Sequence, residues 1–193
     1  MIMIIVVLLI IITGYVIATY NKLQTLKTRI AASIQEIGNQ LKRQAQLIPN
    51  LVNSAKGYLE HEKGIFDKLS EARKAIETAV KSNSAQKMVE AQELVQKGLS
   101  GLRVIVESNP QIQASGVVTK LMDELGDTAN KVMYARRTLI DLTADFNRIL
   151  ITVPSSFVGK VFSIKPEKGL QMPAEGEHLS VSKEEIKAPK VEL

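Results

Sequence analysis

The sequence predicts an all-α protein, in which a single N-terminal transmembrane helix continues into an antiparallel, up-and-down four-helix bundle and a disordered C-terminal tail follows. Three observations predict this class. Residues 1–20 are apolar and carry no charged side chain. Across residues 21–153, apolar side chains recur at steps of three and four, which is the spacing of one helix face. Residues 166–193 are rich in Pro, Glu and Lys, a composition that is typical of disorder.

Residues 1–20 read MIMIIVVLLIIITGYVIATY. A helix of about 20 residues, at ~1.5 Å each, spans the ~30 Å hydrocarbon core of a bilayer. Twelve of the positions from Ile2 to Ile17 are Ile, Leu or Val, and together they favour insertion by about 4 to 7 kcal/mol. A signal peptide would have a basic start and a small-x-small cleavage site. This segment has no basic start and only a poor cleavage site, so we favour a permanent anchor. A lipoprotein anchor is excluded because the chain has no cysteine.

The charges next to the anchor predict its orientation. No basic side chain precedes it, whereas Lys22, Lys27 and Arg29 follow it closely. Because basic residues are enriched on the cytoplasmic side of a span, we expect the short N-terminus outside the cell membrane and the C-terminal domain in the cytoplasm. The net charge of +5 leaves nucleic-acid binding as one interpretation. We favour a solvated helical surface with lipid-facing cations, because no dense basic run alternates with aromatic residues.

The first soluble helix is expected over residues 20–48 as a direct continuation of the anchor, because no helix breaker separates the two. Pro49 lacks an amide N–H and disfavours α geometry at Ile48, so a kink or a short break is predicted there. The apolar pattern restarts at Leu51 and predicts a second helix that reaches Ala79. Asn50 could cap that helix.

The third helix is expected over residues 85–107, after a polar loop that ends in a candidate N-cap, Ser84. Gly98 and Gly101 interrupt its apolar face, at a cost of about 1 kcal/mol each relative to alanine. Two interpretations stay open. The glycines either allow a close approach of another helix or are simply tolerated.

The last long helix is expected over residues 110–152. Ser108 or Asn109 can cap it, Pro110 suits its first turn, and Pro154 stops it. Fraying is expected near Gly116. Residues 154–165 form a short capping segment, either an extended stretch or a helical turn, and residues 166–193 form the tail. Four such helices with short connections pack most simply as an antiparallel bundle over residues 21–153.

Several stretches resemble the LemA family of bacterial membrane-anchored helical proteins. The most specific stretch is LKRQAQLIPNLVNSAKGYLEHE at residues 41–62, and weaker ones follow in order, so that the resemblance spans about residues 20–162. The resemblance implies a single-pass membrane protein with a long helical domain and no known enzymatic activity. Some relatives take part in shaping bacterial organelle membranes. The motif residues are Tyr20, Asn21, Leu47, Ile48, Pro49, Asn50, Leu51, Val52, Gly57, Tyr58, His61, Glu62, Arg73, Asn130, Arg136, Asn147 and Pro154.

The pair His61–Glu62 raises the question of a metal-dependent hydrolase. That chemistry needs a second histidine four residues after the first, on the same helix face. Ile65 occupies that position, and the only other histidine, His178, lies in the tail. We keep the hydrolase only as a remote alternative and expect no metal site.

Arg73 and Arg136 could contact a ligand. We favour ion pairs with carboxylates at the bundle edge, such as Glu62, Asp127 or Asp141. The sequence contains no Gly-rich phosphate loop, nucleophile elbow or paired-carboxylate motif. We therefore expect no catalytic residue, no cofactor and no small-molecule substrate.

These observations favour a membrane-anchored scaffold or interaction protein that contributes to membrane organisation. Its expected partners are the lipid bilayer and either other proteins or further copies of itself. The alternative is a membrane-tethered signalling or sensory element that relays a state through the continuous anchor and first helix. The lack of a second span and of an external domain disfavours that alternative.

Overall fold

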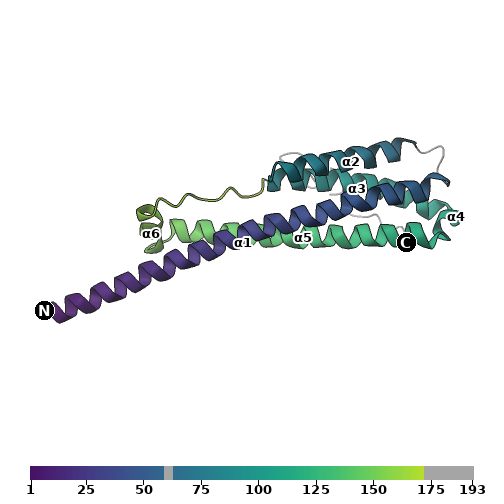
Figure 1. Ribbon diagram of the computed structural model, residues 1–193. Helices are drawn as coiled ribbons and strands as arrows, with labels where there is room; N and C mark the ends of the chain where they lie inside the picture. The colour runs from purple at the N-terminus through teal and green to yellow at the C-terminus, as the bar shows by residue number, and fades with distance from the viewer. Residues whose placement is uncertain (59–62, 172–193) are drawn as a thin grey trace, which may run out of the picture.

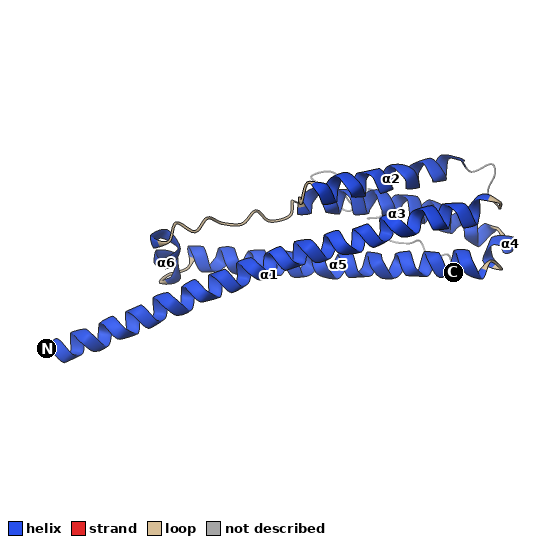
Figure 2. Cartoon of the chain, in the orientation of Figure 1, coloured by secondary structure: helices blue, strands red, loops and turns tan. Residues whose placement is uncertain are grey.

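The computed structural model describes residues 1–58 and 63–171, and within these residues the chain forms helices and no strand, as Figures 1 and 2 show. The all-α prediction is therefore confirmed. The helices are, in chain order, α1 (Ile2–Lys56), α2 (Lys63–Lys81), α3 (Ala85–Ser108), α4 (Pro110–Gln113), α5 (Gly116–Ile151) and α6 (Ser155–Val161).

The four long helices alternate in direction and form the predicted antiparallel bundle (Figure 1). α1 packs mainly along α5 and α2 mainly along α3, while α1 also contacts α2. The core between them is aliphatic apart from Phe146. The largest fully buried side chains are Phe146, Leu23, Ile37, Leu41, Ile48, Leu51, Leu69, Ile76, Met88, Leu102, Ile112 and Leu125.

α1 is a single helix of 55 residues, about 80 Å long at ~1.5 Å per residue. The predicted continuity of the anchor with the first soluble helix is confirmed. Its N-terminal part leaves the bundle and extends alone, as the purple end in Figure 1 shows. Burial begins at Thr19 and Leu23 and then follows one face of the helix. Within the described residues, α1 is the helix long and apolar enough to cross a membrane.

The predicted break at Pro49 is wrong. α1 runs through Pro49 to Lys56, so that Asn50 lies inside a helix rather than capping one, and the second helix does not begin at Leu51. An internal proline costs about 3 kcal/mol. Leu51 is 0% exposed, as is Ala55. Burial of one leucine alone contributes about 1.5 to 3 kcal/mol, and therefore the continued core face outweighs the proline.

The predicted helix caps of the middle region are confirmed. The Ser84 hydroxyl accepts a hydrogen bond from the Lys87 amide at the start of α3. Asn109 Oδ1 accepts one from the Gln111 amide, 3.1 Å away, with Pro110 in the first turn. The single helix expected over residues 110–152 is divided instead into α4 and α5. The division is at Ser115, next to Gly116, and it lets Ile112 turn fully inward.

For the capping segment at residues 154–165, an extended stretch and a helical turn were both considered. The structure has the helix, α6. After it, residues 162–171 run back along the bundle, as the tan loop in Figure 2 shows. The Asn147 side chain holds this segment: its Nδ2 donates to the Glu167 carbonyl and its Oδ1 accepts from the Glu167 amide, both at 2.9 Å. The predicted disorder is therefore wrong for residues 166–171, because a side chain pairs with their backbone and Leu170 packs against the core. Residues 172–193 lie outside the described part.

Candidate functional site

The two helix pairs of the bundle are not packed equally on all sides. α3 lies close to α2, where a Cβ atom on Gly98 would lie 2.8 Å from Leu69 Cδ2 and one on Gly101 would lie 3.3 Å from Ile65 Cδ1. The glycines therefore allow the close approach that was one of their two interpretations. On its other side α3 makes few contacts with α5. The seam between α3 and α5 is open as a result.

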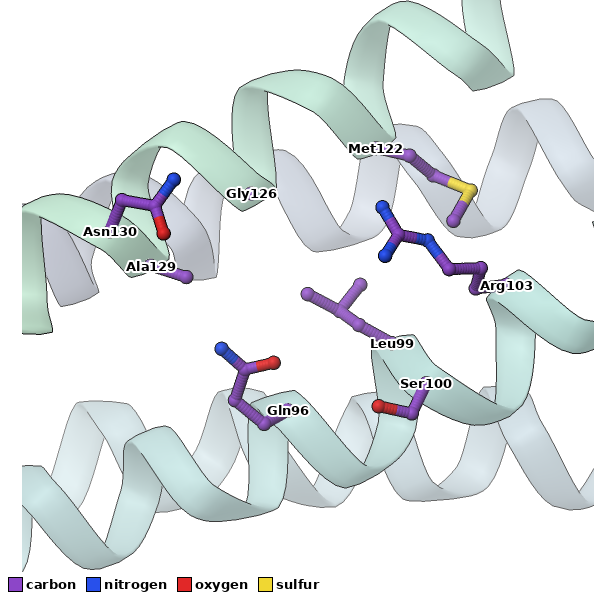
Figure 3. Close-up of a pocket in the computed structure, with 8 residues that line it drawn as sticks. All are labelled: Gln96, Leu99, Ser100, Arg103, Met122, Gly126, Ala129 and Asn130. Atoms are coloured by element: carbon purple, nitrogen blue, oxygen red, sulfur yellow. The ribbon is translucent and has the colours of Figure 1, made fainter.

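A groove lies along this seam, and we call it the α3–α5 groove (Figure 3). Its main hollow has a volume of about 280 Å³, and a second hollow of about 190 Å³ continues it. Figure 3 shows Arg103 reaching from α3 toward Met122 of α5, with Leu99 between the two helices. The main hollow is lined by Gln96, Leu99, Ser100, Arg103, Met122, Gly126, Ala129 and Asn130. The second is lined by Val89, Gln92, Glu93, Gln96, Ala129, Val132, Met133 and Arg136.

Amide and guanidinium groups are available for binding in this groove. The side-chain amides of Gln96 and Asn130 line the main hollow, whereas both polar atoms of Gln92 are shielded from solvent and have no hydrogen-bond partner among the described residues. A buried amide without a partner is unfavourable, by about 1 to 3 kcal/mol. Among the described residues, no carboxylate oxygen lies within 4.0 Å of a nitrogen of Arg103 or Arg136. These groups can donate hydrogen bonds to a docked acceptor, and the apolar floor can take an apolar side chain.

The motif residues lie in several separate parts of the structure. Leu47, Ile48, Leu51 and Val52 pack in or against the core on α1. Asn50, Gly57 and Tyr58 are exposed at the C-terminal end of the same helix. Asn130 and Arg136 line the groove from α5.

Three further motif residues lie at the end of the bundle from which α1 projects. The ring of Tyr20 contacts that of Phe162, with centroids 4.7 Å apart. Asn21 is exposed on the next position of α1. Pro154 directly precedes α6. Together with Asn147, which holds Glu167, these residues fix where the chain folds back after α5.

The two arginines differ in their surroundings. Arg73 pairs with Glu77, with 3.3 Å between Nε and Oε1, so a carboxylate partner is present but it is on the next turn of the same helix. Arg136, for which we expected a carboxylate partner, has none within 4.0 Å in the described residues. His61 and Glu62 lie outside the described residues, so the hydrolase alternative has no geometry to test. Within the described part, no three His, Cys, Asp or Glu side chains gather around a common point.

The sequence analysis missed the α3 side of the groove. Gln92, Gln96, Leu99 and Arg103 follow one another at steps of four, three and four. This is the spacing of a helix face, and it lies beside the apolar face that was identified. The signal that could have revealed it was a second stripe, mostly polar, on a helix that already has an apolar stripe.

The family model described as the LemA family matches residues 33–187. The matched range contains the 41–62 block and both sides of the α3–α5 groove. The Tyr20–Leu23 stretch precedes it. A comparison with curated proteins gives no match.

Proposed function

The chain belongs to the LemA family, and on this premise we propose that it is a non-catalytic scaffold held in the bacterial inner membrane by a single span. The observation that carries the proposal is the form of α1. Its residues 2–17 are apolar and have no partner within the described bundle, whereas residues 19–55 pack in it. A rigid helix that is lipid-soluble at one end and part of a folded domain at the other suits a tether.

We propose that the bundle lies in the cytoplasm. Lys22, Lys27 and Arg29 follow the span, and no carboxylate precedes Glu36. Cytoplasmic flanks are enriched in such basic residues. A cysteine placed at Asn53, near the far end of α1, tests this orientation, since a membrane-impermeant maleimide will label it only in opened cells. Labelling in intact spheroplasts contradicts the orientation.

The α3–α5 groove is the surface that we propose for a protein partner. Its apolar floor and its polar rim of amides and guanidinium groups resemble the anatomy of protein-binding surfaces. Arg103 and Arg136 favour a partner segment with acidic or carbonyl acceptors.

Photo-crosslinking in living cells tests this scaffold function. A photoreactive residue replaces Ser100, which lines the groove, and we expect reproducible protein neighbours. The exchange Arg103→Glu reduces their yield several-fold by reversing the charge in the groove. Lys97→Glu is the matched control, because it makes the same charge change on an exposed position of α3 that lines neither hollow. No reproducible neighbour, or equal losses in both variants, contradicts the proposal.

A signalling element is the second candidate, and the unbroken length of α1 favours it. A signal would have to move α1 relative to α5, its main packing partner. Disulfide crosslinking between cysteines placed on the two helices then depends on the stimulus. If the crosslinking rates do not change under any stimulus, the signalling candidate is contradicted and the static scaffold remains.

A further inference from the structure

A concentrated apolar surface lies at the end of the bundle from which α1 projects. We call it the α6 patch and define it as Ile151, Val153, Phe157, Val161 and Phe162, which are 76%, 75%, 61%, 77% and 46% exposed. The described residues from 20 to 150 have only seven similarly exposed large apolar side chains, and they are scattered. Isolated exposed apolar residues are ordinary, but five of them within residues 151–162 indicate an interaction surface.

α6 is held firmly in this place. It packs against both α1 and α5. The Ser155 hydroxyl donates to the Ile149 carbonyl 2.7 Å away, and Val158 is buried. Gly159 lies so close to α5 that a Cβ atom there would be 2.7 Å from Leu150 Cδ2. The exposed side of α6 therefore cannot rotate into the bundle.

The α6 patch lies at the level where the apolar segment of α1 ends. Phe162 contacts Tyr20, with ring centroids 4.7 Å apart, and Tyr20 directly follows Thr19, the first buried residue of α1. Figure 1 shows α6 beside α1 at the point where the purple helix leaves the bundle. If residues 2–17 cross a bilayer, α6 is at its surface.

The charges nearest the patch are mostly positive. Residues 149–166 contain Lys160 and Lys165 and no acidic side chain, and Glu167, which lines the same hollow as Phe162, follows them. On α1, the first carboxylate is that of Glu36, while Lys22 and Lys27 lie next to the span. A surface that combines exposed aromatic and aliphatic groups with lysines is suited to the headgroup region of an anionic leaflet.

We propose that α6 is a second membrane contact, which lies in the surface of the same bilayer that α1 crosses. Phe157, Val161 and Phe162 enter the headgroup region, and Lys160 and Lys165 contact anionic lipid phosphates. The inference rests on the membrane span of the proposed function. Its consequence is that the bundle is held at two points and keeps a defined tilt relative to the membrane.

Nitroxide accessibility in nanodiscs of anionic phosphatidylglycerol tests the proposal with the full chain. The chain has no cysteine, so a single label at Val161→Cys reports from one place. We expect this label to be more accessible to oxygen, which concentrates in lipid, than to a water-soluble nickel chelate. The matched control is Val104→Cys, because Val104 is 67% exposed on α3, and we expect the opposite preference there.

Two outcomes overturn the inference. One is a Val161 label with the same preference as the Val104 label. The other is a Val161 label shielded from both reagents, because this indicates a protein contact, such as a second copy of the chain. A third label at Ile10→Cys separates the two proposals. An Ile10 label in lipid with a Val161 label in water removes only the α6 contact, whereas an Ile10 label in water removes the membrane span as well.

Charge reversal tests the role of the lysines. In the Lys160→Glu, Lys165→Glu chain we expect the oxygen-to-nickel accessibility ratio of the Val161 label to fall at least about twofold in anionic nanodiscs. Both lysines are exposed, so the fold is expected to persist, and circular dichroism checks this. An unchanged ratio overturns the assignment of anionic lipid as the occupant.

Discussion

Residues 2–17 and 23–55 of α1 belong to one uninterrupted helix, yet their side chains are distributed in opposite ways. In the first part, apolar side chains surround the helix and are largely exposed. In the second part, they form one stripe, and the residues on it are nearly all buried. Apart from Pro49, which lacks an amide N–H, the two parts have the same helical backbone hydrogen bonds. The pattern of side chains alone therefore separates the two parts: the second belongs to a protein core, and the first has the length and composition of a membrane span.

The largest effect is expected from charges introduced into the first part, residues 2–17. The double exchange Leu9→Arg, Ile10→Arg adds about 5 to 7 kcal/mol against insertion, which cancels the gain from the apolar residues. We expect the chain to move from the alkali-resistant membrane fraction to the soluble or aggregated fraction. The control is Ala31→Arg, Ala32→Arg, at adjacent exposed positions of the same helix. Retention of the first variant in washed membranes contradicts the assignment of residues 2–17.

The same type of substitution in both parts sharpens the comparison. Leu41 is 0% exposed in the bundle core, and Leu41→Ala is expected to lower the free energy of unfolding by about 2 to 5 kcal/mol. Leu9→Ala, in the first part, should leave bundle unfolding nearly unchanged. Denaturant titration followed by circular dichroism in detergent measures both. Equal effects would mean that the two parts do not have separate surroundings.

Pro49 tests how far the bundle part tolerates a defect in α1. Pro49→Ala restores a helical amide, and we expect stabilisation by about 1 to 3 kcal/mol in the same titration. Pro110→Ala is the control, because Pro110 occupies the first turn of α4, where proline is tolerated. Destabilisation by Pro49→Ala would show that the proline is required for the course of α1.

The smallest expected effect concerns the segment that follows α6, at the boundary between the two parts. Asn147→Ala removes both hydrogen bonds to Glu167, each contributing about 0.5 to 1.5 kcal/mol. We expect faster hydrogen exchange at the Glu167 amide and earlier proteolysis within residues 163–171, with little change in global stability. Asn53→Ala, at an exposed position of α1, provides the control. Unchanged exchange at Glu167 would contradict the role of Asn147.

Much of the fold was predictable because it depends on local periodicity. The continuity of α1, the caps at Ser84 and Asn109 and the stop at Pro154 all follow from neighbouring residues. The break at Pro49 was wrongly predicted, because the local cost of proline is outweighed by tertiary burial of Leu51 and Ala55.

The features that the sequence did not predict depend on contacts between distant residues. Asn147 and Glu167 are 20 positions apart, and no local pattern indicates their pairing. The α3–α5 groove lies on the side of α3 opposite its close approach to α2, which Gly98 and Gly101 allow. Of its lining, Asn130 and Arg136 were identified through the family resemblance, whereas Gln92, Gln96 and Arg103 were not.

The segment after α6 determines the position of residue 171, where the described part of the chain ends. The amide of Gln171 donates to Gln86 Oε1, 3.0 Å away, beside the start of α3. Near the start of α3, Met88 contacts α1 at Gly38, where a Cβ atom would lie 3.5 Å from the Met88 side chain. Gly38 is about 28 Å along α1 from Thr19, at ~1.5 Å per residue. The described part of the chain therefore ends alongside the middle of the bundle, away from the apolar segment of α1.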